Sequence, residues 1–171
     1  MDIDHRKDIP LGCVINSDIM TFLKRKPAFR SACIEVPKKR NISGDSEEWP
    51  FFNISFGFYR MYCLLVVPKE LNDLEEGHAF FLDLESKNIM RNFTVLASEY
   101  GEIVPIHQMF RLLRNAVSHV NYSINQDDKI EFWNKKFNGD ENWRVSIHHN
   151  EMVQFLGELE LPVIELMRRD T

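Results

Sequence analysis

The sequence has few cysteines, and they form no recognisable metal or disulfide pattern. Its 171 residues include Cys13, Cys33 and Cys63, an odd number at wide spacing, with no CxxC pair and no histidine at a zinc-ligand interval. This pattern excludes the disulfide framework of a small secreted domain. We therefore expect reduced thiols in a cytoplasmic protein, with no metal and no other cofactor.

The sequence also lacks a hydrophobic run long enough to cross a membrane. The most apolar stretch, FFNISFGFYRMYCLLVV at 51–67, has 17 residues and carries Arg60 near its centre. The N-terminal MDIDHRKDIP is charged and has no apolar signal-peptide core. We expect no membrane association, no export, and a buried helix at 51–67 in which Arg60 pairs with a carboxylate. A buried strand is the competing interpretation of this run.

Positive charge is in deficit, with 21 Lys and Arg against 26 Asp and Glu and a formal net charge of −5. The mean field therefore disfavours nucleic acid, and any polyanion site must be a local basic cluster. Hydrophobic residues make up 44% of the chain, which is enough for one core. We predict one domain over residues 1–171, in which 45–171 form the core bundle and 1–44 form an N-terminal helix and loop.

Helical patterns dominate the first hundred residues. Ser17 is a suitable N-cap for a short helix over 17–26 that Pro27 ends, and 36–50 has the mixed composition of a surface loop. After the apolar run, Pro68 is placed to start a further helical turn. Apolar residues then recur at helical spacing over 78–100, which predicts an amphipathic helix ended by a glycine at 101.

The last third combines helices with one small β element. The segments KIEFWNKKF and NWRVSI alternate apolar and polar residues around FNGDEN, which predicts a β-hairpin with a glycine in its turn. A final helix follows, with Asn150 as N-cap and Pro162 kinking or restarting it. The expected fold class is all-α, a helical bundle with a small β-hairpin between the last two helices.

The helix that begins after Pro105 ends in an unusual polar segment, RLLRNAVSHVNY at 111–122. Residues four apart on a helix lie about 40° apart in azimuth, so Arg114 with Ser118, and Asn115 with His119, form two adjacent polar stripes. Arg114 and His119 are about 140° apart. Both can touch one phosphate only if the helix ends or loosens near His119, the arginine reaches round, or a second chain supplies a group.

These residue types suit cleavage of an RNA phosphodiester without a metal. A histidine can exchange a proton with the 2′-hydroxyl or the leaving oxygen, and a guanidinium matches the charge that the phosphate gains. The competing interpretation is an ordinary helix end, where a cationic group favours the helix dipole. Arg144 and His149 have the same spacing, so spacing alone is weak evidence.

The segment RNAVSH, preceded by FRLL and followed by a hairpin and a last helix, resembles the RNxxxH form of the Rx4-6H motif of the HEPN (higher eukaryotes and prokaryotes nucleotide-binding) superfamily. The resemblance covers about residues 105–167 and is best with small stand-alone bacterial and plasmid-borne members. Many of these have a glycine after the histidine, where this chain has Val120. The resemblance implies a dimeric helical bundle in which two copies of the motif face each other in a cleft.

By this resemblance, Arg114, Asn115 and His119 are the expected catalytic residues, with Arg111 and Ser118 as substrate-binding residues. The expected activity is that of a metal-independent endoribonuclease, used as a toxin or antiviral effector in a bacterium, with an antitoxin or nucleotidyltransferase as a possible protein partner. The alternatives are a non-catalytic HEPN module that binds a nucleotide or a protein, and a purely structural dimerisation bundle.

Overall fold

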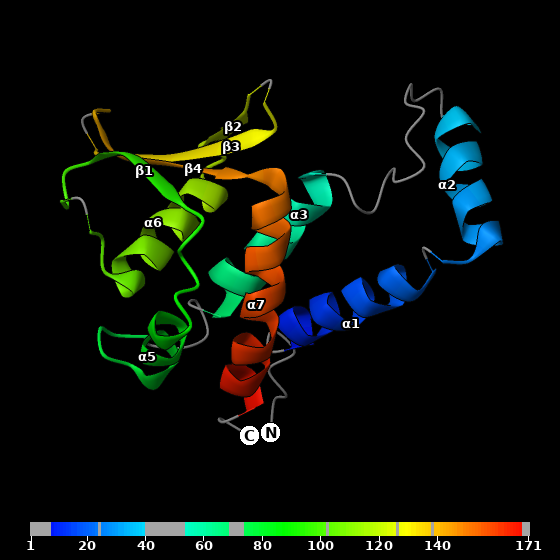
Figure 1. The fold of residues 1–171 in the computed structure, drawn as a ribbon, viewed down its shortest axis with the longest axis horizontal. Coiled ribbons are helices and arrows are strands. Elements are labelled where there is room, and N and C mark those ends of the chain that lie inside the picture. The colour runs from blue at the N-terminus through cyan, green and yellow to red at the C-terminus, as the bar shows by residue number, and fades with distance from the viewer. Residues whose placement is uncertain are drawn as a thin grey trace.

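The computed structural model describes residues 8–23, 25–39, 54–68, 74–101, 103–125, 127–137 and 139–168. A small antiparallel sheet lies across one end of the helical part, with α6 (Ile106–Ser118) and α7 (His149–Arg168) directly beneath it, and α2 (Pro27–Lys39) extends away to one side (Figure 1). The elements are, in chain order, α1 (Asp8–Leu23), α2 (Pro27–Lys39), α3 (Ile54–Met61), the π-helix η2 (Tyr62–Val66), α5 (Ala79–Ser86), β1 (Thr94–Ser98), α6 (Ile106–Ser118), β2 (Tyr122–Ile124), β3 (Lys129–Lys135), β4 (Glu141–His148) and α7 (His149–Arg168).

The predicted all-α fold class is wrong, because the protein is a mixed α/β structure. Four strands form one sheet in the order β1-β4-β3-β2, and each neighbouring pair is antiparallel. The predicted hairpin is β3–β4, which does lie between α6 and α7, and Gly139 in its turn has a φ of 92°. The two outer strands, β1 and β2, were not predicted from the sequence.

Strand β1 lies within the segment that was predicted as a helix over 78–100. The helix α5 ends at Ser86, and Asn88 has a φ of 47°, so the chain leaves the helical path there. The following residues pair with β4, with Thr94 opposite Ser146. The apolar positions fitted helical spacing, but pairing with a strand about fifty residues later decides the conformation, because it satisfies the backbone groups of this segment.

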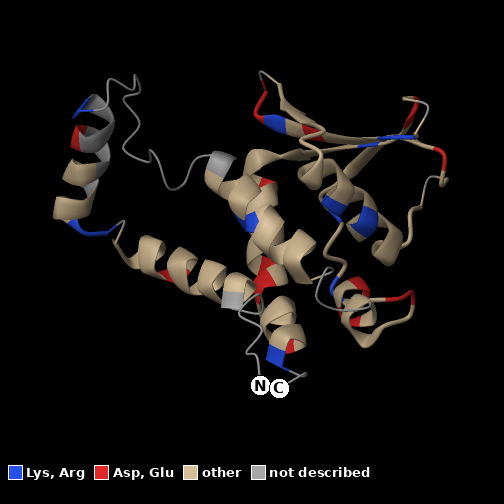
Figure 2. Cartoon of the chain, turned by 180° about the vertical axis from the view of Figure 1, so that it is seen from behind, with Lys and Arg blue, Asp and Glu red and all other residues tan. Residues whose placement is uncertain are grey.

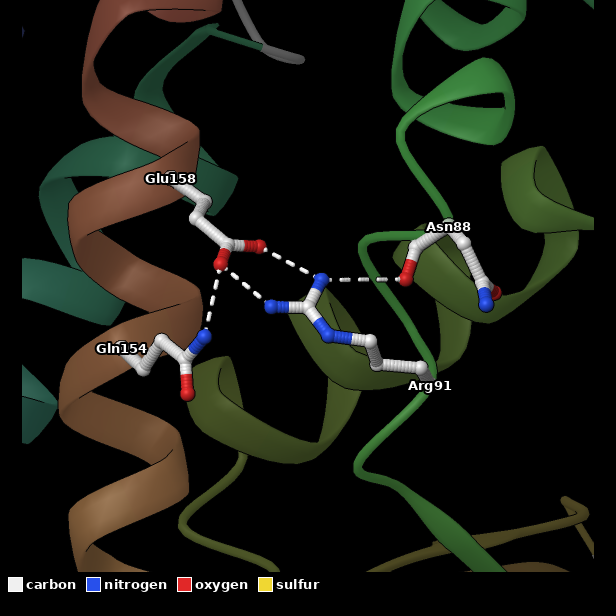
Figure 3. Close-up of polar contacts among 4 residues, drawn as sticks. All are labelled: Asn88, Arg91, Gln154 and Glu158. Carbon is white, nitrogen blue, oxygen red and sulfur yellow. Dashed lines mark hydrogen bonds and ion pairs between the residues drawn. The ribbon is translucent and has the colours of Figure 1, made fainter.

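An arginine cluster fixes the turn between α5 and β1 to the last helix. The Arg91 guanidinium donates two hydrogen bonds to the Glu158 carboxylate and one to the Asn88 carbonyl, and Gln154 donates to the same carboxylate (Figure 3). The bond to Arg91 lowers the pKa of Glu158 below its ordinary value. By holding this turn against α7, the cluster helps to determine where β1 begins.

The apolar run is helical through the part that the structure describes, as predicted, although its second half is a π-helix. Residues 63–66 of η2 are all buried, which is consistent with a helix that packs on several sides. Arg60 is 8% exposed and pairs with the Glu160 carboxylate on α7, which confirms the predicted structural ion pair. Cys63 shares a hydrogen bond with Cys13 of α1, and this bond together with burial raises the pKa of the Cys13 thiol.

The N-terminal elements differ from the prediction. Ser17 lies inside α1 and is not its N-cap, and Pro27 begins α2, where its fixed φ suits the first helical position. Of the loop predicted at 36–50, residues 36–39 are helical and the rest lie outside the described residues. The turn predicted after Pro68, and the boundary at 44/45, also lie outside them. Among the described residues, no helix is both long and apolar enough to span a membrane.

Candidate functional site

Helix α6 has one buried face and one polar face. The buried face contains Met109, Phe110, Leu112, Leu113, Ala116 and Val117. The polar face contains His107, Arg111, Arg114, Asn115 and Ser118, and the helix has no acidic residue along its whole length. Figure 2 shows both charged positions of α6 as basic. In a chain with a net charge of −5, this face is a local basic cluster of the kind that a polyanion site requires.

The sheet holds α6 in place from the buried side. Asn134 on β3 is 6% exposed, and its side-chain amide donates a hydrogen bond to the backbone carbonyl of Leu112. Inward-facing residues of β3, such as Phe132, pack in the same core as Leu113. The polar face of α6 therefore points away from the core because its opposite face is bonded and packed against the sheet.

The helix ends immediately before His119. His119 has a φ of −100° and a ψ of 8°, and Val120 has a φ of 56°, in the left-handed region. The N–H of Asn121 donates to the Ala116 carbonyl at 2.8 Å, which closes the end of the helix in the manner of a Schellman motif. The first condition for bringing His119 and Arg114 to one phosphate, a helix that ends near His119, is met. Val120 occupies the position where glycine is preferred.

The structure brings two of the predicted site residues into direct contact. Arg114 donates hydrogen bonds from Nε and Nη2 to the side-chain oxygen of Asn115, at 3.2 and 2.9 Å. His119 is exposed, and no hydrogen bond or ion pair of its imidazole occurs among the described residues. Arg111 and Ser118 are also exposed. Within one chain, therefore, Arg114 and Asn115 form a pair and His119 stands apart from it.

The second Arg and His pair of the same spacing has a different environment. Arg144 forms ion pairs with Glu141 and Glu131 and lies over the ring of Trp133. The hydrogen bonds to Glu141 and then to Glu131 raise the pKa of Arg144. Two carboxylates therefore neutralise this guanidinium, and His149 lies at the start of α7. The ion pairs of Arg144 and the position of His149 at the start of a helix favour a structural role for this pair.

A pocket at the N-terminal end of α6 was not predicted from the sequence. It has a volume of about 160 Å³ and is lined by Leu64, Leu65, Pro68, Leu74, Phe80, Phe81, His107, Phe110 and Arg111. The only sequence signal was that His107 and Arg111 are four apart, which places them on one stripe of α6. The apolar walls come from η2, α5 and the segments beside them, and no local pattern indicated that these would meet.

Among the described residues, no group of three His, Cys, Asp or Glu side chains lies close enough together to hold a metal ion. Metal independence of the site stays a prediction.

A protein-family model described as HEPN pEK499 p136 matches residues 14–167, nearly the whole chain. No curated protein and no solved structure matches the chain.

Proposed function

The chain belongs to the HEPN pEK499 p136 family, and from this membership and the α6 site we propose that it is a metal-independent endoribonuclease acting in the cytoplasm as a toxin or antiviral effector. HEPN domains are often ribonucleases or nucleotide-binding modules. The single observation that carries the proposal is the exposed imidazole of His119 at the end of a helix face that has two arginines and no acidic residue.

In the proposed reaction, His119 acts as the general base or the general acid. As a base it takes the proton of the 2′-hydroxyl, the 2′-oxygen attacks phosphorus, and the bond from phosphorus to the 5′-oxygen breaks. The leaving 5′-oxygen receives a proton, and the products carry a 2′,3′-cyclic phosphate and a 5′-hydroxyl. Arg114 stabilises the negative charge that the phosphoryl oxygens gain, and Asn115 orients Arg114 through its two hydrogen bonds.

We propose that the active form is a homodimer. One chain supplies one imidazole at this site, whereas the reaction needs both a proton acceptor and a proton donor. A two-fold arrangement of α6 would present two copies of His119 to one phosphate and would place an arginine on each side. Light scattering that gives a monomer at the concentration where RNA is cleaved would contradict the dimer.

The test of the function compares two histidines. We expect His119→Ala to lower the rate of RNA cleavage by roughly 10²- to 10⁴-fold while folding is retained, because the side chain is exposed. His149→Ala is the matched control and should keep most of the activity. Arg114→Lys should also be damaging, because lysine keeps the charge but loses the fork that binds two phosphate oxygens. Equal cleavage by the wild type and His119→Ala would overturn the catalytic assignment.

One observation favours a second candidate, a HEPN module that binds a nucleotide without cleaving it. The Arg114 guanidinium is already bonded to Asn115, and no bond joins it to His119 within the described part of the chain. Such an arrangement suits static recognition of a phosphate. This candidate predicts no cleavage by the wild type and weaker binding of a mononucleotide by Arg114→Gln.

A further inference from the structure

The pocket at the N-terminal half of α6 has an apolar interior and a polar rim. Phe80, Phe81 and Phe110 are each at most 8% exposed and contribute three aromatic rings that contact one another edge to face. Leu64 and Leu65 of η2 also line the pocket. At the rim, Arg111 is exposed and the His107 ring contacts Phe81. A ligand of this pocket must therefore have an apolar, flat part and a negatively charged part outside it.

The size of the pocket restricts the apolar part of the ligand. A cavity of about 150 Å³ lined by Leu, Ile and Phe holds a single aromatic ring, and pockets for whole drug-sized ligands are about 300 Å³ or more. The volume of about 160 Å³ therefore suits one ring system and is too small for a complete nucleotide or a long acyl chain. The charged part of the ligand would lie outside, beside Arg111.

A hydrogen-bond donor lies at the rim and an acceptor lies beside it. Arg111 donates only, whereas Oε2 of Glu76, which is outside the pocket lining, lies 3.7 Å from Nε2 of the lining residue His107 and belongs to an exposed carboxylate. A nucleobase has donors and acceptors on its edge and a planar apolar face, and aromatic protein side chains commonly bind it. An aliphatic carboxylate would use Arg111 but would leave the other rim groups without a partner.

The position of the pocket connects it with the proposed cleavage site. Arg111 and His119 are eight residues apart, which corresponds to about 12 Å along the helix axis at 1.5 Å per residue. Phosphates of a stacked strand repeat at about 3.4 Å along the axis, so this distance corresponds to a few nucleotides. Arg114 and Ser118 lie between them on the same polar face.

We propose that this pocket binds one nucleobase, with Arg111 holding the adjacent phosphate, and that in the proposed ribonuclease it selects a base a few nucleotides from the scissile bond. The binding part of the proposal stands by itself, and only the part about RNA rests on the proposed function. Arg111 is then a specificity-determining residue and does not take part in the chemical step.

The first experiment measures binding without catalysis. AMP, CMP and ribose 5-phosphate are titrated into the full-length His119→Ala protein by isothermal calorimetry, with the methyl groups of Leu64 and Leu65 followed by NMR. We expect at least one mononucleotide to bind at least tenfold more tightly than ribose 5-phosphate and to shift both methyl signals. Equal binding of ribose 5-phosphate would show an anion site only and would overturn the proposal.

Variants locate the binding. Arg111→Gln is a surface change that leaves the core intact, and we expect it to weaken mononucleotide binding at least tenfold. The matched control is Arg25→Gln, another exposed arginine, located between α1 and α2, which should bind as tightly as the parent. Leu65→Phe fills the pocket and should abolish binding. Unchanged binding in Arg111→Gln would overturn the proposal even if Leu65→Phe fails to fold.

The second experiment uses RNA oligonucleotides that lack one base at successive positions around a mapped cleavage point. We expect wild-type cleavage to fall at least tenfold for one abasic position a few nucleotides away, and Arg111→Gln to lose this dependence. Cleavage that is equal for all abasic positions would overturn the selection of a base while the ribonuclease proposal stands. Mononucleotide binding at the pocket without any RNA cleavage would overturn the proposed function and leave the pocket assignment intact.

Discussion

The guanidinium of Arg114 and the side-chain oxygen of its neighbour Asn115 are joined by two hydrogen bonds, of 3.2 and 2.9 Å. Adjacent helical residues do not normally face each other, so the contact depends on the length of the arginine side chain, which lets it reach round the helix surface. The bonds leave the positive charge in place, because an amide oxygen is uncharged. Asn115 therefore orients Arg114 without neutralising it.

This relationship predicts different effects of two substitutions at Asn115. Asn115→Ala removes the orientation and should lower RNA cleavage roughly tenfold to a hundredfold, since small misplacements of a positioned group have effects of that size. Asn115→Asp should lower cleavage further, because the new carboxylate pairs with Arg114 and repels phosphate. Single-turnover rates of RNA cleavage measure the effects of both substitutions. A faster reaction with Asn115→Asp than with Asn115→Ala would contradict the role given to Arg114.

The left-handed conformation of Val120 predicts that a glycine there stabilises the protein. A non-glycine residue in this region is strained by about 1–2 kcal/mol, and glycine relieves the strain at some cost in chain entropy. We expect Val120→Gly to raise the free energy of unfolding by about 1 kcal/mol in urea denaturation. Val153→Gly, at the fifth residue of α7, is the control and should lower the free energy of unfolding by roughly 0.5 kcal/mol. If Val120→Gly and Val153→Gly change the free energy of unfolding in the same direction, backbone strain at Val120 is ruled out as the explanation.

The buried ion pair between Arg60 and Glu160 predicts a large effect of removing one partner. Arg60 and Glu160 side chains are 10% and 19% exposed, so Glu160→Gln leaves a poorly solvated charge and should cost about 3 kcal/mol or more of unfolding free energy. Replacement of both, Arg60→Met with Glu160→Leu, should recover most of the loss. Glu158→Gln breaks the more exposed pair with Arg91 and should have a clearly smaller effect. Similar losses of unfolding free energy for Glu160→Gln and Glu158→Gln would show that burial of the ion pair does not determine the size of the effect.

The proposed mechanism predicts that cleavage does not depend on divalent metal. Proton transfer by His119 and charge stabilisation by Arg114 supply the chemistry that a metal ion would otherwise provide. RNA cleavage in excess EDTA should therefore proceed within about twofold of the untreated rate. Loss of cleavage in EDTA, with recovery on addition of Mg²⁺ or Mn²⁺, would show that the mechanism is incorrect.

Features that depend on local patterns were predictable from the sequence. The apolar spacing of α6 and the alternation in β3 and β4 each have a short period that tertiary contacts did not override. Arg60 was expected to have a carboxylate partner because a buried charge requires one, although which glutamate it contacts depends on the packing of α3 against α7.

Features that depend on distant pairing were not predictable. Strand β1 is stabilised by β4, and the pattern of Thr94–Ser98 alone does not identify that partner. The residues of the candidate site stay a prediction, and their geometry could not be derived from the sequence. The spacing of Arg114 and His119 leaves the end of the helix undetermined, and it is the left-handed Val120 and the bond from Asn121 that place that end before His119.

Asn121 connects the end of α6 to the sheet. Its N–H bonds to Ala116 on the helix, and its carbonyl accepts a hydrogen bond from the N–H of Trp133 on β3 at 3.1 Å. Proteins open locally in cooperative units, and amides released by one opening exchange their hydrogens together. We therefore expect the last turn of α6 and the β2–β3 pairing to open as one such unit, with matching hydrogen-exchange rates at Asn121 and Trp133. When that unit opens, we expect the backbone at His119 to leave its fixed conformation while the helices below the sheet stay folded.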